Sequence, residues 1–246
     1  MKRFWLALAV LFVLVPATRA ADPAVNVLID AIRERRVDVV STMLLANPQL
    51  ASGVDVMGVS VLHYAAGCGD KRILQSVLGA RPNVNVLDHQ GRTPIFRACE
   101  ETHGDNLNLL LAHQANPNVA DGNGMTPLLI VCEKGKPDMA RSLLAAGARV
   151  DAVNKDGTGA LMYAGLRGNP KLATILLGAG AKANAVDAQG NTALHYAARS
   201  GERDMIKLFP TLINVKNAAG QTPLSIAAIA GHTKFVQELA KFGATN

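Results

Sequence analysis

The side chains that could do chemistry in this 246-residue chain are few and scattered. His63 and His195 could serve as metal ligands or general bases. The other histidines have no ligand spacing between them: His89, His103, His113 and His232. The chain also lacks the P-loop, dinucleotide-binding, G-x-S-x-G, H-E-x-x-H and C-x-x-C motifs. We therefore predict no catalytic residue, no metal site and no cofactor.

The three cysteines do not form an obvious disulfide framework. Cys99 and Cys132 lie 33 residues apart, at equivalent places in a repeated pattern described below. Stacked helices lie about 8–10 Å apart, which exceeds the ~7 Å that a disulfide tolerates between Cα atoms. We interpret both residues as small core side chains, and we expect Cys68 to be the more exposed thiol.

A period of 33 residues organises the chain. Glycines mark it at Gly58, Gly91, Gly124, Gly157 and Gly190, and Gly220 follows 30 residues later. Two residues after each glycine a short block begins, at Ser60, Thr93, Thr126, Gly159, Thr192 and Thr222. An apolar position then recurs at Val77, Leu110, Leu143, Leu176, Phe209 and Leu239. Such a period is typical of a solenoid in which each unit packs against its neighbours.

Each part of the pattern has a mechanical reason. The glycine supplies a positive φ in a turn. The Thr two residues later can cap a helix by accepting a hydrogen bond from a free N–H. Proline is tolerated in the first turn of that helix. A second turn, with Gly at 69, 135, 168, 201 or 231, leads to a second helix.

The blocks resemble the T-P-L-H-x-A signature of the ankyrin repeat, which has the same period. The resemblance extends almost continuously from Val54 to Asn246, and residues 26–50 keep only the helical pattern. It implies an all-α fold, an ankyrin-repeat solenoid of about seven helix-turn-helix units with short β-hairpin loops. We place the units at 24–54, 55–87, 88–120, 121–153, 154–186, 187–216 and 217–246. The first is a cap, whose charged run at 33–36 would face solvent.

The resemblance also assigns roles to the aromatic polar residues. It implies that His63 and His195 tether adjacent hairpins through hydrogen bonds. All three tyrosines follow the fourth residue of a block, at Tyr64, Tyr163 and Tyr196. We expect this stripe to pack between the two helix layers.

Two units depart from the pattern. In 154–186, Gly159 replaces the capping Thr and Gly165 replaces an Ala, so its first helix should be the weakest. The unit 187–216 is three residues short and has Pro210 inside its second helix. That helix should end early.

The first twenty residues have the pattern of a signal peptide. Lys2 and Arg3 precede an apolar run from Phe4 to Val15, and Ala20 offers a cleavage site before Ala21. An uncleaved anchor is the alternative, but the run of twelve is shorter than the roughly twenty residues of a spanning helix. We predict a signal peptide at 1–20 and a mature domain at 21–246.

Cleavage would leave a chain with little excess charge. Lys2, Arg3 and Arg19 lie in the leader, so the formal charge falls from +6 to +3. That balance is too mild to indicate nucleic acid or a membrane surface. We predict a monomer with neither nucleic acid nor stable membrane insertion, and with an unidentified protein as its partner.

The ankyrin resemblance implies that a partner contacts the hairpin tips and the inner face of the first helices. The tip positions are Val56, Met57, Val59, His89, Gln90, Arg92, Asn123, Met125, Lys155, Thr158, Gln189 and Asn191. The helix positions are Glu100, Glu101, Glu133, Lys134, Arg167 and Arg199. The early tips are apolar and are expected to be exposed, and the helix row turns from acidic to basic. An apolar patch beside a charge gradient suits a specific protein interface.

The leading hypothesis is a non-catalytic module in the bacterial periplasm that holds, protects or inhibits one partner. Exported bacterial ankyrin repeat proteins, which this chain resembles, include accessory factors in oxidative defence and proteins that neutralise dangerous enzymes. An enzyme hidden in the stack would need polar groups that converge across units. A secreted effector that binds host proteins is the other alternative, and recovery in the culture medium would favour it.

Overall fold

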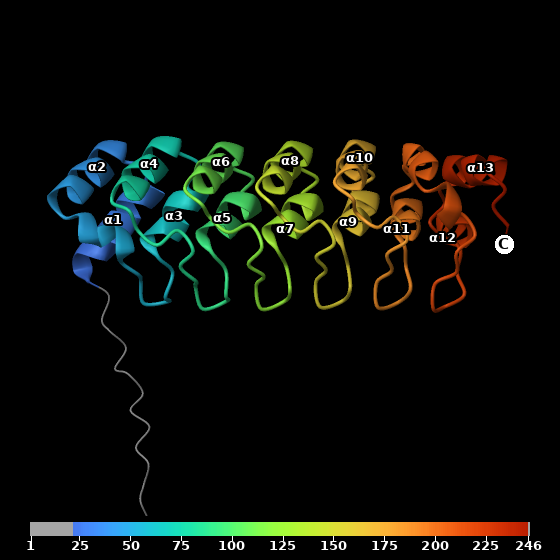
Figure 1. Ribbon diagram of the computed structural model, residues 1–246, viewed down its shortest axis with the longest axis horizontal. Coiled ribbons are helices and arrows are strands. Elements are labelled where there is room, and N and C mark those ends of the chain that lie inside the picture. Colours follow the sequence, from blue (N-terminus) through green and yellow to red (C-terminus); the bar gives the residue numbers. More distant parts are fainter. Residues whose placement is uncertain (1–21, 246) are drawn as a thin grey trace, which may run out of the picture.

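The helices of the protein form paired rows in a single elongated stack (Figure 1). The computed structural model describes residues 22–245, so the predicted signal peptide at 1–20 lies outside the described residues. Between residues 22 and 245 there are no β-strands, only isolated bridges that join Val54 to Ser60 and Val153 to Gly159. The all-helical fold is confirmed, and the number and boundaries of its units stay predictions.

Each first helix except α11 (Ala193–Ser200) is followed by a second α-helix that runs back beside it. The first helices are α1 (Pro23–Arg33), α3 (Val61–Gly67), α5 (Pro94–Glu100), α7 (Pro127–Glu133), α9 (Ala160–Leu166), α11 (Ala193–Ser200) and α12 (Pro223–Ile229). The second helices are α2 (Val37–Ala46), α4 (Lys71–Gly79), α6 (Gly104–Ala112), α8 (Pro137–Ala145), α10 (Pro170–Gly178) and α13 (Thr233–Lys241). A 3₁₀ turn, η1 (Pro48–Ser52), follows α2. All of these helices are shorter than the roughly 12–15 residues that an isolated helix needs, so packing must stabilise them.

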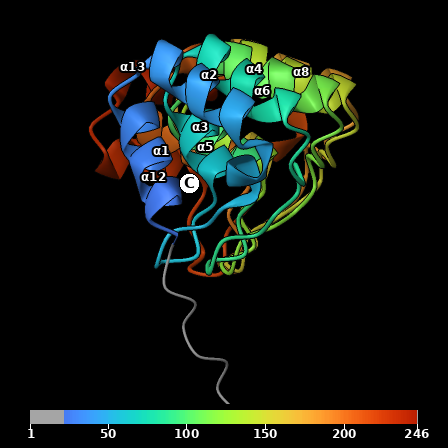
Figure 2. The same ribbon diagram turned by 90° about the vertical axis from the view of Figure 1, so that its left-hand side faces the viewer.

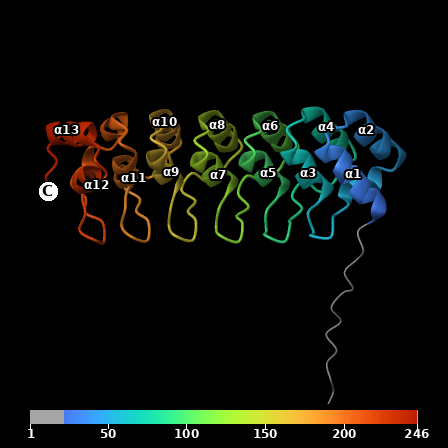
Figure 3. The same cartoon turned by 180° about the vertical axis from the view of Figure 1, so that it is seen from behind.

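Hairpin loops project from one side of the stack. Seen along its length, the helices gather on one side and the loops extend together on the other (Figure 2). The view from behind shows the loops side by side in a row (Figure 3). The six hairpin glycines all have a φ between 71° and 77°, which a side chain would resist.

The predicted helix caps are only partly present. The hydroxyls of Ser60, Thr126 and Thr222 accept a hydrogen bond from the backbone N–H three residues later. Thr93 and Thr192 make no such bond, so the capping prediction was wrong for them. The Thr192 hydroxyl bonds the ring of His195 instead. The Thr93 hydroxyl is buried with no partner among the described residues, because Phe96 stands where that histidine would be.

Small residues line the contact between successive first helices. The row is fully buried and consists of Ala66, Cys99, Cys132, Gly165 and Ala198. The predicted apolar row of the second helices is also buried, with Phe209 and Leu239 at its end. The prediction that Cys99 and Cys132 are core residues is confirmed, and all three cysteines are free thiols. Small side chains allow the helix backbones to approach closely.

Gly165 is the extreme case in this row. A Cβ added there would overlap the carbonyl oxygen of Ala193 and would stand 3.1 Å from the backbone nitrogen of Ala197. The glycine therefore allows α9 to pack directly against α11. Glycine has a low helix propensity, but α9 is seven residues long, as are α5 and α7. Whether α9 is the least stable first helix stays a prediction.

The unit with Pro210 has no second α-helix. In its place are two 3₁₀ segments, η2 (Arg203–Leu208) and η3 (Pro210–Leu212). Proline lacks the N–H that would continue the helical bonding. The prediction that this helix ends early is confirmed.

The first helix pair exposes a charged edge. Residues 33–36 are exposed, as expected for a terminal unit. No helix between residues 22 and 245 has both the length and the apolar character required to cross a bilayer.

We predict that Gly165→Ala destabilises the protein even though alanine is the better helix former. The propensity gain is at most about 1 kcal/mol, whereas overpacking costs about 1–3 kcal/mol. The new methyl group would press on backbone atoms of α11, which cannot move without shifting the helix. Urea unfolding followed by circular dichroism should show a lower midpoint.

Gly178→Ala is the matched control for this change. Gly178 ends α10 and no atom lies within 4 Å of its added Cβ. The control should be neutral or slightly stabilising. Equal midpoints for the two variants would contradict the close approach of α9 and α11.

Candidate functional site

Each hairpin is held by one side-chain oxygen at its start. The residues concerned are Asp55, Asp88, Asp121, Asn154, Asp187 and Asn217. In each, Oδ1 accepts hydrogen bonds from the backbone N–H groups two and four residues later, over 2.8–3.1 Å. The sequence analysis missed these residues. Their signal is an Asp or Asn three residues before each hairpin glycine.

Three of these carboxylates are ionised more readily than usual. Burial alone would raise the pKa values of Asp55, Asp88 and Asp187, but hydrogen bonds outweigh it and lower them below 3.8. Beside the hairpin N–H groups, Asp55 accepts from Tyr64 and Asp88 from Arg92. The carboxylates therefore stay charged and hold the hairpins at neutral pH.

Successive hairpins are bonded directly to one another. The backbone N–H of Gly122 donates to Gln90 O at 3.1 Å, and that of Lys155 donates to Asn123 O at 3.0 Å. The same bond recurs further along, from Ala188 to Asp156 and from Ala218 to Gln189. The first junction is different, because the ring of His89 stands over Gly58. These bonds fix the tips in one register.

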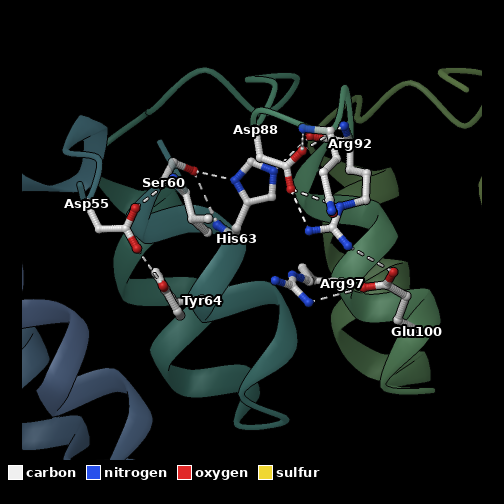
Figure 4. A network of polar contacts seen from close by, with 10 residues as sticks. Asp55, Ser60, His63, Tyr64, Asp88, Arg92, Arg97 and Glu100 are labelled. Atoms are coloured by element: carbon white, nitrogen blue, oxygen red, sulfur yellow. Dashed lines mark hydrogen bonds and ion pairs between the residues drawn. The ribbon is translucent and has the colours of Figure 1, made fainter. Parts of the chain in front are cut away.

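The two block histidines tether hairpins, as the family resemblance implied. His63 Nε2 lies 2.9 Å from Arg92 O, and its Nδ1 lies 2.7 Å from Ser60 Oγ (Figure 4). His195 makes the same pair of contacts with Gln221 O at 3.1 Å and Thr192 Oγ1 at 2.8 Å. Since a carbonyl only accepts, Nε2 must donate and Nδ1 of the neutral ring must accept.

This bonding leaves the histidines unsuited to catalysis. Burial lowers the pKa of both rings below the ordinary 6.5, although the bonded carbonyls oppose it. Both nitrogens of each ring are occupied by protein atoms. Within residues 22–245, no three His, Cys, Asp or Glu side chains are grouped so that they could hold a metal ion.

The three tyrosines connect α3, α9 and α11 to the hairpins that precede these helices. The hydroxyl of Tyr64 donates to Asp55 Oδ2 at 2.7 Å, and that of Tyr196 donates to Asp187 Oδ2 at 2.8 Å. The hydroxyl of Tyr163 accepts from the amide of Asn154. Tyr163 belongs to the buried core and Tyr64 packs against it, while the hydroxyls of all three tyrosines bond the hairpins, a contact that the sequence analysis did not predict.

The tip residues proposed from the sequence differ in accessibility. The side chains of Val56 and Met57 are 76% and 67% exposed, as expected. Val59 is only half-buried rather than exposed, so that expectation was wrong. The other exposed tip residues are His89, Gln90, Asn123, Lys155 and Gln189. Met125 and Asn191 are half-buried, and Thr158 is buried.

Arg92 is engaged within the protein (Figure 4). Its guanidinium pairs with Asp88 Oδ2 at 2.8 Å and with Glu100 Oε1 at 3.2 Å, and its side chain is only 15% exposed. Glu100 also pairs with Arg97. The acidic start of the predicted charge gradient is thus partly neutralised. Because its charge is paired within the protein, Arg92 stabilises the hairpin and is not a free charge for a partner.

The remaining helix positions lie along one face of the first helices. Glu101, Lys134, Arg167 and Arg199 are exposed, and Glu133 is half-buried. Arg167 reaches the preceding unit, where its Nε donates to the carbonyl oxygen of Glu133. The basic half of the gradient is therefore present at the surface.

The surface formed by the hairpins and the first helices has a hollow near each end of the stack. A hollow of about 340 Å³ at the amino-terminal end is lined by α3 and by residues that include Arg33, Cys68 and Arg97. A larger one of about 700 Å³ lies between the last two hairpins and the helices α11 and α12. The sequence analysis missed the contribution of α12. Continuing the block register into the last unit would have found Ile229.

Cys68 is half-buried beside the smaller hollow and, as expected, is more exposed than Cys99 and Cys132. Its thiol donates to Ala65 O at 3.2 Å, and burial raises its pKa. Burial also raises the pKa values of the Cys99 and Cys132 thiols. A raised pKa lowers the thiolate fraction and with it the reactivity of each cysteine.

Comparison with known proteins agrees with this architecture. The family described as ankyrin repeats (3 copies) matches overlapping segments at 28–121, 62–154, 103–187, 128–217 and 161–246. The chain therefore belongs to the ankyrin repeat family. Such repeats indicate a protein–protein interaction module.

One human protein, Rabankyrin-5, also matches part of the chain. The two are 41% identical over 56 residues, which are 23% of this chain and 5% of Rabankyrin-5. The chain thus corresponds to a small part of that protein. The match supports the presence of ankyrin repeats in this chain.

We predict that Arg92→Ala destabilises the protein by about 2–4 kcal/mol, because it leaves the buried Asp88 carboxylate without its charged partner. The readout is the urea midpoint. Arg97→Ala is the control, since it removes only a more exposed pair with Glu100 and should cost below about 1 kcal/mol. Equal losses would contradict the structural role of Arg92.

We also predict a loss of stability as the pH falls below about 6.5. In the unfolded chain the two histidines take up protons there, whereas their lowered pKa values keep them neutral in the fold. Their stabilisation is therefore complete above 6.5 and is lost as the pH falls toward their folded values, by at most about 1.4 kcal/mol per pH unit for each ring. The aspartates act in a separate window below 3.8.

The double variant His63→Gln, His195→Gln should flatten this dependence between pH 6.5 and 5, measured by urea unfolding at each pH. His113→Gln, at an exposed residue, should keep the wild-type slope. An unchanged slope in the double variant would show that other groups cause the loss.

Proposed function

We propose that the protein is a periplasmic module that binds one partner protein across its hairpin tips and first helices, in order to hold, protect or inhibit that partner. The observation that carries the proposal is the separation of roles within each hairpin. Asp or Asn oxygens and the backbone hold the loop, while side chains such as Val56, Met57 and Gln90 extend outward.

A surface held in this way is suited to binding. The tips are fixed by bonds between neighbouring hairpins and by the histidine tethers. A partner would therefore order few loops on association, which reduces the entropic cost. The exposed Val56 and Met57 offer apolar area, and the basic residues along the helices offer charge complementarity.

The available side chains support a role without catalysis. Both buried histidines are neutral and fully bonded, and the thiols have raised pKa values. The periplasmic location rests on the leader pattern of residues 1–20. A secreted effector would carry the same leader, so fractionation is needed to separate the two.

Capture from cell fractions tests the proposal. The tagged protein, incubated with periplasmic extract, should retain a specific partner, and Val56→Ser, Met57→Ser should reduce its recovery at least tenfold because it removes the exposed apolar tip. Leu45→Ser is the matched control. It removes an 85% exposed apolar side chain from α2, in the other helix layer, and should leave capture unchanged.

Several results would count against the proposal. Wild-type protein that captures nothing specific would remove the binding function. Equal loss in the tip variant and the Leu45 control would remove the proposed face. Accumulation of the native protein in the culture medium rather than in the periplasm would favour the secreted effector.

A further inference from the structure

The eighth residue of each block forms a row along the first helices. The row reads Gly67, Glu100, Glu133, Leu166, Arg199 and Ile229. Its acidic members come first, and Glu100 is already paired within the protein. Its last three members alternate between apolar and basic side chains. Leu166 is 40% exposed, Ile229 is 77% exposed, and Arg199 lies exposed between them.

The larger hollow opens at the end of this row. Its lining includes the apolar side chains of Ile226 and Ile229 and amide side chains such as those of Gln189 and Asn217. The last hairpin has Ala218 and Ala219 at its tip, so small side chains leave the space open. A volume of about 700 Å³ lies within the range of clefts that bind ligands, roughly 300–1,000 Å³.

The charge in this hollow is unbalanced. Among the described residues that line it, only Arg199 carries a formal charge, because burial keeps His195 neutral. Arg199 forms no ion pair with any residue between 22 and 245. The stretch from 217 to 230 has no charged residue at all. An exposed guanidinium in apolar surroundings is complementary to a carboxylate, which it can bind through two parallel hydrogen bonds.

The spacing of the row fits an extended peptide. Neighbouring first helices lie about 8–10 Å apart. An extended segment in the polyproline II conformation advances about 3.1 Å per residue with three residues per turn, so every third side chain lies on the same face. Three residues of extended chain therefore span one unit. Side chains that meet Leu166, Arg199 and Ile229 in turn would lie at every third residue.

We propose that the hollow and the adjoining surface at Leu166 bind an extended segment of the partner with the pattern apolar-x-x-acidic-x-x-apolar. The acidic side chain pairs with Arg199, and the apolar side chains cover Leu166 and Ile229. The inference rests on the proposed binding function and adds the chemistry of the bound segment. A basic residue at the central position is excluded by repulsion from Arg199.

Two synthetic peptides test the pattern. Both are acetylated and amidated heptapeptides with Leu at positions 1 and 7 and Ser elsewhere, and they carry either Glu or Lys at position 4. Titration into the full protein is followed by methyl NMR of Leu166, Ile226 and Ile229. The Glu peptide should shift these methyl signals saturably, and the Lys peptide should bind at least tenfold more weakly.

Charge reversal provides the decisive variant. Arg199→Glu should lower the affinity for the Glu peptide at least tenfold and should raise the affinity for the Lys peptide. The fold should be retained, because no hydrogen bond or ion pair of the Arg199 side chain is found within residues 22–245, and the bond from His232 goes to its backbone carbonyl. Lys234→Glu makes the same charge change on α13, in the other helix layer, and should leave both peptides unaffected.

Equal binding of the two peptides, binding of neither, or Glu-peptide affinity that survives Arg199→Glu would overturn the inference. These outcomes are distinct from failure of the proposed function. If the protein captures a partner that Arg199→Glu retains fully, the binding function stands and this site is wrong. If it captures nothing, the function fails, and the peptide titration still decides the chemistry of the hollow.

Discussion

The close approach of neighbouring first helices is the constraint on which the rest of the structure depends. Small buried residues, from Ala66 to Ala198, set that approach, and at Gly165 no side chain fits at all. Because the helices stack closely, the hairpins that precede them come within hydrogen-bonding distance. The tethers from His63 and His195 then become possible, since each reaches a carbonyl of the next unit. The arrangement of the hairpin surface therefore depends on the close packing of the first helices in the core.

Much of this architecture could be predicted, because each turn, helix start and buried row of the repeat has a characteristic residue type at a fixed position in the sequence. The hairpin glycines, the buried apolar rows and the interruption at Pro210 each follow from a local rule. The misses have a common cause. The tyrosine hydroxyls, the unbonded Thr93 and the close packing at Gly165 depend on which atoms of a neighbouring segment stand opposite. A single unit does not contain that information.

The candidate site was predicted less completely than the fold. Register alone placed Met57, Gln90 and Arg199 at the surface, where the structure has them. Register could not show that Arg92 is occupied by Asp88 and Glu100, or that Thr158 is buried. The larger hollow depends on two adjacent units and on the small tip of the last hairpin. Cavities of this kind arise from pairs of units, which a list of equivalent positions does not describe.

The division of labour inside each hairpin has a consequence for how such a protein changes over time. One Asp or Asn and one glycine maintain the loop. The two positions between them are bonded through backbone atoms, and His89, whose ring stands over Gly58, is an exception. Substitutions at those two positions can therefore alter recognition while leaving folding nearly untouched. Natural selection can explore new binding partners a pair of residues at a time. The specificity of each hairpin can therefore change independently of its neighbours, while the fold stays the same.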